Sequence, residues 1–279
     1  MVKLKFKVFE FLVKSARWQF LAKTEKEIYF ISNVRNYSTY NEEGFIAINE
    51  TSGHVEIVSF EEVKNSFPAK KTFVSGNPVK PSVFRIIDKP FQINKNRKVI
   101  YITGGSLGSH SINLHIKKII IPLLNKYIVI HQAGDTKEYH DFEDLSVIKK
   151  DLPKELQSRY FLVKHFFDNE IGYIYSKADL VIGRAGANTF FELLALNKPA
   201  LFIPLPWSSG REQQHHAEIF AKSGCGEIFH QITPSEKLLR LINQMIEKID
   251  YYKGNFKYLS KFYKKNVSKY LIDEIFNQT

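Results

Sequence analysis

The sequence predicts an α/β fold built on an open parallel sheet, and three observations support this. Short apolar runs, each long enough for one buried strand, recur at 99–103, 127–131, 160–163, 180–182 and 200–203. Segments with the apolar spacing of helices lie between them, among them 112–124 and 190–196. Glycine turns follow several of these strands. Strands that alternate with helices in this way are typical of parallel sheets joined by crossover helices.

The stretch 178–216 organises the chain. It begins with a buried strand, continues through a turn that contains Gly183 and Gly186, and enters a helix that Pro199 ends before a second buried strand. The two strands must be parallel, so the helix is a right-handed crossover. Glycines let a ligand approach the backbone, and the helix N-terminus favours an anion. This pattern predicts a phosphate-bearing ligand.

The N-terminal part is less regular. Residues 81–97 are rich in Pro, Lys and Asn, which indicates a linker between residues 1–80 and a C-terminal domain at 98–279. Before the linker we expect strands at 3–9, 28–31, 54–59 and 72–74, helices at 10–22 and 60–66, and a polar loop at 33–43.

The C-terminal part continues the alternation. Beyond the strands and helices named above, we expect helices at 143–150, 170–176 and 212–222, a strand at 227–229 and further helices in 234–278. In open parallel sheets ligands bind outside the carboxyl ends of the strands. The glycine turns all fall at such ends.

Composition sets broad limits. The chain has 279 residues, 44% apolar residues and a formal charge of +11, which suits a sizeable core and an anionic partner. A single cysteine, Cys225, excludes an internal disulfide and fits a reducing compartment. No apolar run of about 18 residues predicts a membrane span. Charges throughout residues 1–14 argue against a secretory leader.

Seven short segments, in order, resemble the MurG family of glycosyltransferases. They are V-S-F-E-E at 58–62, G-N-P-V-K at 76–80, G-G-S-L-G-S at 104–109, H-Q-A-G at 131–134, A-D-L-V-I-G-R-A-G-A-N-T-F-F-E at 178–192, K-P-A-L-F-I-P-L-P at 198–206 and R-E-Q-Q-H-H-A at 211–217. The resemblance covers roughly four-fifths of the chain. It implies a GT-B fold, with a Rossmann-like parallel sheet domain that binds the donor and a shortened N-terminal α/β domain on the acceptor side.

The family's function is implied with the fold. It is inverting transfer of GlcNAc from UDP-GlcNAc to a lipid-linked, polyprenyl diphosphate acceptor in peptidoglycan synthesis, at the inner face of the cell membrane. The implied partners are UDP-GlcNAc, the lipid-linked acceptor and an anionic membrane surface, with no cofactor and no nucleic acid. Without an Asp-x-Asp pair in the sequence, we expect a metal-independent reaction. Two alternatives stay open: a donor-binding subunit that needs a membrane-anchored partner subunit, and a non-catalytic nucleotide-sugar-binding remnant.

Carried over position by position, the resemblance implies nine donor-binding residues. Those expected to contact the diphosphate or the sugar are Lys80, Ser106, Ala187 and Asn188, and Thr189 belongs to the same donor site. The others are Phe167, whose backbone would meet the uracil edge, Glu192, which would bind the ribose hydroxyls, and Glu212 and Gln213, which would read the GlcNAc ring. The general base is unassigned; Glu42, Glu43 and Glu50 are the carboxylates considered for it.

Several of these residues have a structural alternative. Thr189 and Glu192 have the spacing of a capping box, in which Glu192 serves only the helix terminus. The glycines of 104–109 could simply close a tight turn. We expect His215 and His216 to be solvent-facing helix residues rather than metal ligands, because no third ligand stands at suitable spacing.

The chain also departs from the family pattern. Lys80 stands where an arginine is usual, which replaces a bidentate contact by a point charge. His216 stands where an asparagine is common, and Arg211-Glu212 where Asp-His is common. Residues 1–57 contain neither the family's glycine-rich acceptor loop nor its H-E-Q-N segment. For membrane attachment the candidates are Lys3, Lys5 and Lys7 with Phe6 and Phe9, or the tail lysines 253, 257, 261, 264 and 265.

Overall fold

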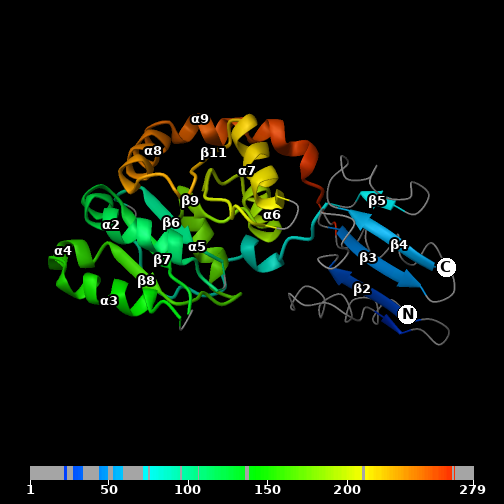
Figure 1. The fold of residues 1–279 in the computed structure, drawn as a ribbon, viewed down its shortest axis with the longest axis horizontal. Coiled ribbons are helices and arrows are strands. Elements are labelled where there is room, and N and C mark those ends of the chain that lie inside the picture. The colour runs from blue at the N-terminus through cyan, green and yellow to red at the C-terminus, as the bar shows by residue number, and fades with distance from the viewer. Residues whose placement is uncertain are drawn as a thin grey trace. The chain divides into compact units, whose positions relative to one another are not determined.

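The computed structural model describes residues 22–23, 28–33, 44–49, 53–58, 72–74, 76–94, 96–105, 107–135, 138–208, 211–265 and 267. The chain forms two compact units. The first unit comprises Met1–Lys80, Trp207–Glu212 and Ser260–Thr279, and the second comprises Pro81–Pro206 and Gln213–Leu259. Figure 1 labels the elements of both.

The described strands of the first unit form one sheet in sequential order. They are β1 (Ala22–Lys23), β2 (Ile28–Asn33), β3 (Gly44–Asn49), β4 (Gly53–Val58) and β5 (Thr72–Val74). From β1 to β4 the strands are antiparallel, and only β4 and β5 pair in parallel. The strands predicted at 28–31, 54–59 and 72–74 are confirmed, whereas β3 was not predicted. The strand expected at 3–9 and the helix at 60–66 lie outside the described residues, as does all of 10–22 except Ala22, which belongs to β1.

The second unit contains the predicted parallel sheet. Its strands are β6 (Val99–Thr103), β7 (Ile128–Gln132), β8 (Tyr160–Val163), β9 (Leu180–Gly183), β10 (Ala200–Phe202) and β11 (Gly226–Ile228), in the order β11-β10-β9-β6-β7-β8. Every pairing is parallel, for example Ile102 opposite Ile182 between β6 and β9. Strands 6, 7 and 9 are buried along their whole length, which is why they read as continuous apolar runs.

Helices connect these strands, mostly where the sequence predicts them. They are η3 (Pro81–Phe84), α2 (His110–Lys126), α3 (Asp141–Asp151), α4 (Lys154–Gln157), α5 (Ile171–Lys177), α6 (Ala187–Ala195), α7 (Glu212–Lys222), α8 (Ser235–Glu247), α9 (Ile249–Gly254) and η5 (Asn255–Phe262). Only the short η3 and α4 have no counterpart among the predictions. Among the described helices, none has the length and apolar character to cross a membrane.

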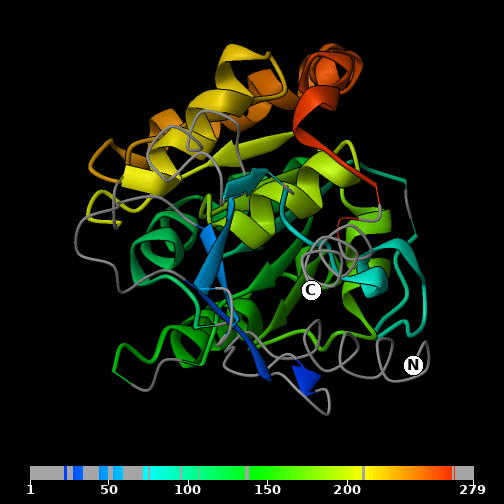
Figure 2. The same ribbon diagram turned by 90° about the vertical axis from the view of Figure 1, so that its right-hand side faces the viewer.

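Helices cover both faces of the parallel sheet (Figure 2). On one face, Ile102 of β6 belongs to an apolar core with Ile116 of α2 and Ile242 of α8. On the other face aromatic rings dominate: Tyr101 of β6 meets Tyr175 of α5 edge-on, with ring centroids 5.8 Å apart. Successive residues of β6 therefore serve opposite cores, as the twofold period of a strand requires.

The strand order reverses between β6 and β9. The chain moves from β6 outward to β7 and β8, then returns to place β9 on the other side of β6. A crevice opens at such a switch point, because the loops leaving the two strands run in opposite directions. The turns that follow β6 and β9 are the two glycine turns that the sequence singles out.

The segment 81–97, expected to be a linker, packs against the second unit. Phe91 stacks on Phe161 with ring centroids 4.5 Å apart, and the Ile93 N–H donates to the Tyr173 hydroxyl at 3.3 Å. A Cβ on Gly172 would overlap with the carbonyl oxygens of Ser82 and Arg85, so η3 lies directly on the start of α5.

Candidate functional site

The glycine turn after β6 touches the end of β7 backbone to backbone. Gly108 and Gly134 both have positive φ, 79° and 88°, and a Cβ on Gly108 would overlap with the carbonyl oxygen of Ala133. Glycine is therefore required at both places by conformation and by space. Ser106, the predicted phosphate contact in this turn, lies outside the described residues. The conformation of this turn is therefore determined by its close packing against the end of β7 as well as by the reversal of the chain.

Arg184, in the turn after β9, joins the loops of three other strands. Its guanidinium donates to the Ile203 carbonyl at 2.7 Å, to the hydroxyls of Ser109 and Ser111 at 2.8 Å each, and to Gln231 Oε1 at 3.1 Å. These acceptors are all neutral, and they lie after β10, β6 and β11. Burial lowers the pKa of Arg184 to about 10, so the group still carries its charge at neutral pH. A positive charge therefore stands at the switch point.

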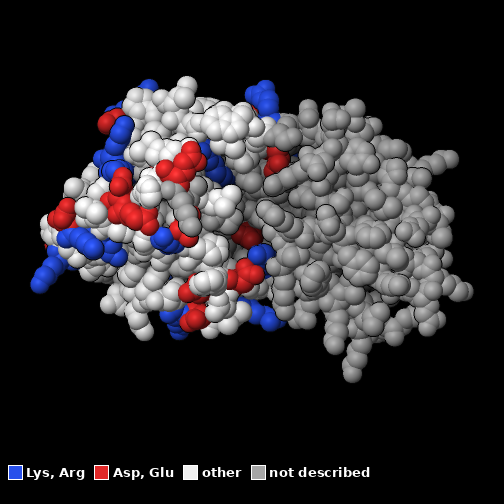
Figure 3. Space-filling model, turned by 60° about the horizontal axis from the view of Figure 1, so that its bottom comes forward, with Lys and Arg blue, Asp and Glu red and all other residues white. Residues whose placement is uncertain are grey.

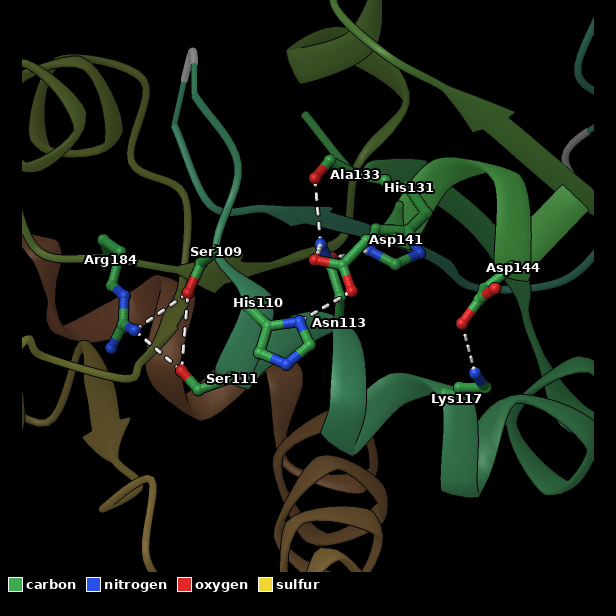
Figure 4. Close-up of polar contacts among 10 residues, drawn as sticks. All are labelled: Ser109, His110, Ser111, Asn113, Lys117, His131, Ala133, Asp141, Asp144 and Arg184. Carbon is green, nitrogen blue, oxygen red and sulfur yellow. Dashed lines mark hydrogen bonds and ion pairs between the residues drawn. The ribbon is translucent and has the colours of Figure 1, made fainter. Parts of the chain in front are cut away.

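The first turn of α2 fixes the neighbouring loops on its other side (Figure 4). His110 Nδ1 donates to Asp141 Oδ1 at 2.8 Å, and the ring stacks on Tyr139 with centroids 4.1 Å apart. Asn113 donates from Nδ2 both to Asp141 Oδ2 at 2.8 Å and to the Ala133 carbonyl at 2.9 Å. One helix terminus thus holds the end of β7 and the start of α3.

His131 is a structural residue. It is completely buried, its Nε2 donates to Asn113 Oδ1 at 3.0 Å, and its Nδ1 accepts from the Tyr160 hydroxyl at 2.9 Å. Burial lowers the pKa of His131 to about 3. A neutral ring with one donor and one acceptor matches both partners, so the network is satisfied without charge.

Phe167 opens the turn that leads into α5. Its side chain is exposed, its N–H donates to Glu170 Oε2 at 2.7 Å, and its carbonyl accepts from the N–H groups of Glu170 and Ile171. Both backbone groups predicted to meet the uracil edge therefore already have partners within the turn. The interaction has the form of one half of a capping box, with Glu170 reaching back to the residue three before it.

The helix α6 begins at Ala187, and Gly186 is its N-cap. Asn188 and Thr189 follow in the first turn, whose N–H groups have no acceptor within a helix. The capping-box alternative for Thr189 and Glu192 is wrong, because Thr189 lies inside the helix and not at its N-cap. A helix dipole and first-turn amides at the switch point favour an anion there.

Glu192 lies in the second turn of α6 and is partly exposed. Its Oε2 accepts a hydrogen bond of 2.8 Å from the hydroxyl of Tyr175, which is buried on α5. The negative charge of Glu192 also contributes to raising the pKa values of Tyr175 and Tyr101, although burial is the main cause of both shifts. Glu192 is therefore a carboxylate that one buried phenol, Tyr175, binds directly.

On α7, Gln213 and His216 both contact backbone of the site loops. Gln213 Oε1 accepts from the Leu205 N–H at 3.0 Å, just after β10. His216 was expected to face solvent, and this is wrong: the ring is 1% exposed, stacks on Phe190 and donates from Nδ1 to the Ala185 carbonyl at 2.8 Å. Burial lowers its pKa to about 4. His216 thereby holds the R-A-G turn in place of the asparagine common in the family.

The remaining expected residues are placed as follows. Glu212 is the first residue of α7, and Lys80 is partly exposed at the end of the first stretch of the first unit. Across the described ranges, no group of three or more His, Cys, Asp or Glu could hold a metal ion. On the face in Figure 3, basic and acidic side chains are interspersed over the described residues.

Of the tail lysines considered for membrane attachment, Lys253 lies 3.9 Å from Asp179 and Lys264 donates to the Val74 carbonyl at 2.7 Å. Lys257 and Lys261 lie over the rings of Tyr258 and Phe262. The N-terminal lysines considered with them lie outside the described residues.

Comparison with known proteins identifies the family. Residues 99–271, well over half of the chain, match the glycosyltransferase family 28 C-terminal domain. The chain belongs to this family. Residues outside the match include most of the first unit.

Two similar proteins carry the same name. The UDP-N-acetylglucosamine–N-acetylmuramyl-(pentapeptide) pyrophosphoryl-undecaprenol N-acetylglucosamine transferase of Thermodesulfovibrio yellowstonii is 30% identical, over 68% of this chain and 52% of that protein. The enzyme of the same name from Clostridium kluyveri is 35% identical, over 65% and 49%. The chain thus spans about half the length of the curated relatives it matches. The crystal structure of Acinetobacter baumannii MurG shares the fold, with a TM-score of 0.59 and 23% identity over 79% of this chain and 60% of that one.

Sequence reasoning missed three residues that shape this family 28 domain: Arg184, Tyr175 and Gln132. Gln132 donates from Nε2 to the Gly105 carbonyl at 2.8 Å and accepts from the Phe166 N–H at 3.2 Å, so it joins two site loops. For each of the three, one local feature of the sequence could have indicated a place in the site. Arg184 and Gln132 are polar residues at the carboxyl ends of buried strands, and Tyr175 lies in a helix that leads into one.

Proposed function

We propose that this chain binds UDP-GlcNAc through its second unit and transfers GlcNAc, with inversion, to a polyprenyl diphosphate-linked acceptor. Membership of family 28 and the names of the relatives support the reaction class. The single observation that carries the proposal is the switch point itself. There, a glycine turn, the N-terminus of α6 and the charge of Arg184 meet at the carboxyl ends of β6 and β9.

Each part of the donor would meet different residues of this site. The uracil edge would lie at Phe167, the ribose hydroxyls at Glu192, and the diphosphate at the amides of Ala187 and Asn188 with Thr189. Ser106 would add a phosphate contact, and Gln213 would read the GlcNAc hydroxyls. Gln213 supports this role through its fixed carboxamide, whose oxygen is bound to Leu205.

Besides these residues the chemistry would need a general base, which is unassigned. A hydroxyl of the acceptor gives its proton to that base and attacks the anomeric carbon from the face opposite the diphosphate, the carbon–oxygen bond to phosphate breaks, and UDP leaves with the electron pair. Amides and cations placed where charge grows stabilise such a leaving group without reorganisation. The positive charge of Arg184 adds to that field. The acceptors described above for its guanidinium are all neutral, so none of them cancels this charge.

We also propose where the protein acts in the cell. We expect the acceptor to bring the protein to an anionic membrane surface at the inner, cytoplasmic face, as a peripheral protein. The basic excess of the chain supports attachment that weakens with salt. Flotation with anionic vesicles at low and high salt tests this, and no binding at low salt contradicts it.

Donor binding is tested by calorimetry with UDP, UDP-GlcNAc and GDP. We expect heat with both uridine nucleotides and weaker binding of GDP. Absence of heat with either uridine nucleotide, or equal affinity for GDP, contradicts the proposal. Transfer is then measured with labelled UDP-GlcNAc and lipid I as acceptor.

A further inference from the structure

A buried tyrosine contacts one of the carboxylates proposed to bind the donor. The hydroxyl of Tyr175 donates to Glu192 Oε2 at 2.8 Å, and Tyr175 is 3% exposed. Tyr175 comes from α5 and Glu192 from α6, so the contact joins two helices. The Tyr175 hydroxyl therefore approaches the partly exposed Glu192 carboxylate from its buried side.

The direction of this hydrogen bond is fixed. Burial, with a smaller contribution from the charge of Glu192, raises the pKa of Tyr175 well above its ordinary value. The phenol therefore stays protonated at any working pH, and a carboxylate can only accept. One oxygen of Glu192 is committed to the interior, which sets the plane and the direction of the other.

The ring of Tyr175 is itself held in place. Tyr101 packs against it edge-on, and the Tyr101 hydroxyl donates to Gln132 Oε1 at 3.3 Å. The same carboxamide oxygen accepts from Phe166, while its nitrogen donates to the carbonyl of Gly105. Buried side chains thus link Glu192 to the glycine turn and to the turn at Phe166. A displacement of one loop would be felt by the others.

We propose that Tyr175 is a positioning residue that fixes the Glu192 carboxylate for a pair of vicinal hydroxyls, so that the site selects ribonucleotides over deoxyribonucleotides. This rests on the proposed function. A carboxylate whose orientation is preset loses less conformational freedom when it accepts from a diol. A purely structural contact, by contrast, would stabilise the fold and treat every nucleotide alike.

The test uses the full chain and three probes: UDP, 2′-deoxy-UDP and 2′,3′-dideoxy-UDP. Affinities are measured by calorimetry for the wild type, Tyr175→Phe, Glu192→Gln and the double variant. In the wild type we expect UDP to bind about tenfold or more tightly than dideoxy-UDP, as for hydroxyls that bind a charged group. Tyr175→Phe should reduce that ratio about three- to tenfold and leave the affinity for dideoxy-UDP unchanged. The ratio of UDP affinity to dideoxy-UDP affinity should be no smaller in the double variant than in Glu192→Gln alone.

Tyr101→Phe is the matched control. It removes a hydroxyl from the neighbouring buried ring without removing the donor to Glu192, so it should change the affinities for UDP and dideoxy-UDP by the same factor. Thermal melting of each variant checks that the fold persists.

Each result decides something. Equal losses for UDP and dideoxy-UDP in Tyr175→Phe, or no loss, would overturn the positioning role. A wild type that binds UDP and dideoxy-UDP equally would overturn it as well, while leaving the proposed function intact. If no uridine nucleotide binds the wild type, both proposals are wrong.

Discussion

The carboxylate of Glu170 accepts a hydrogen bond from the backbone N–H of Phe167 at 2.7 Å. The resemblance to the MurG family predicts that this same backbone meets the edge of uracil. A uracil oxygen and a carboxylate oxygen are both acceptors, so they compete for one N–H. Nucleotide binding must then displace Glu170 or leave the N–H unused by the base.

Replacing Glu170 by alanine should therefore have opposite effects on stability and on binding. We expect the free energy of unfolding to fall by about 1 kcal/mol, as for other lost helix caps. UDP should bind several-fold more tightly, because the N–H is released and a negative charge is removed. Calorimetry and urea denaturation measure the two effects.

Asp168→Ala is the control for charge, because Asp168 is an exposed carboxylate in the same turn. If both variants bind UDP more tightly by the same factor, the gain comes from removing a negative charge near the site and not from releasing the Phe167 N–H. If Glu170→Ala weakens UDP, the capped turn itself is the base-binding conformation and the competition does not exist.

Glu192→Ala probes the proposed contact with the ribose hydroxyls. We expect UDP binding to weaken by about 1–3 kcal/mol, the range for groups that lose a charged hydrogen-bond partner. The structure excludes the alternative in which Glu192 caps α6, because that helix begins five residues earlier at Ala187. Unchanged affinity by calorimetry, with a normal melting temperature, would remove Glu192 from the donor site.

Most of the second unit could be predicted from the sequence because its strands are buried on both faces. Val99–Thr103 is an uninterrupted apolar run bounded by Lys98 and a glycine turn, and its bounds were predicted to the residue. In the first unit, β3 (Gly44–Asn49) was missed. Its sequence follows a polar stretch and mixes glycine and alanine with apolar residues, which is a weaker signal than a long run of branched residues.

The site could be predicted only where its chemistry is local in sequence. Gly183, Gly186 and Glu192 stand within one motif, so their common location was foreseeable. The partners of Arg184 come from segments up to 75 residues away, as for Ser109. Burial of His216 depends on Phe190 and on the Ala185 carbonyl, which only the fold brings to it. Non-local contacts of this kind leave no pattern in a single sequence.

Two buried histidines should make the protein sensitive to mild acid. In the folded state the pKa is about 3 for His131 and about 4 for His216, against roughly 6.5 when unfolded. The unfolded state therefore binds more protons below pH 6.5, so stability is full above that value and is lost as the pH falls. Between pH 7 and pH 5 we expect a loss of about 2 kcal/mol for each histidine.

Urea denaturation at the two pH values measures this loss. His216→Asn should reduce it by about 2 kcal/mol, because an asparagine can donate to the Ala185 carbonyl without titrating. His215→Asn, an exposed neighbour on the same helix, is the matched control and should leave the difference unchanged. An identical pH dependence in His216→Asn and the wild type would mean that His216 becomes charged within the folded protein.

The last prediction concerns Arg184, whose guanidinium reaches four acceptors on the loops after β6, β10 and β11. Lysine keeps the charge but offers one compact donor group, which cannot span the Ile203 carbonyl and the Ser109 hydroxyl at once. Arg184→Lys should therefore lower the free energy of unfolding by about 1–3 kcal/mol and weaken UDP by about tenfold, because the glycine turn loses its anchor. Arg159→Lys is the control: Arg159 donates to the Leu124 carbonyl at the opposite end of α2, so its loss should cost stability and leave UDP affinity unchanged. If Arg184→Lys binds UDP as the wild type does, charge alone suffices at this position and the four hydrogen bonds serve only the fold.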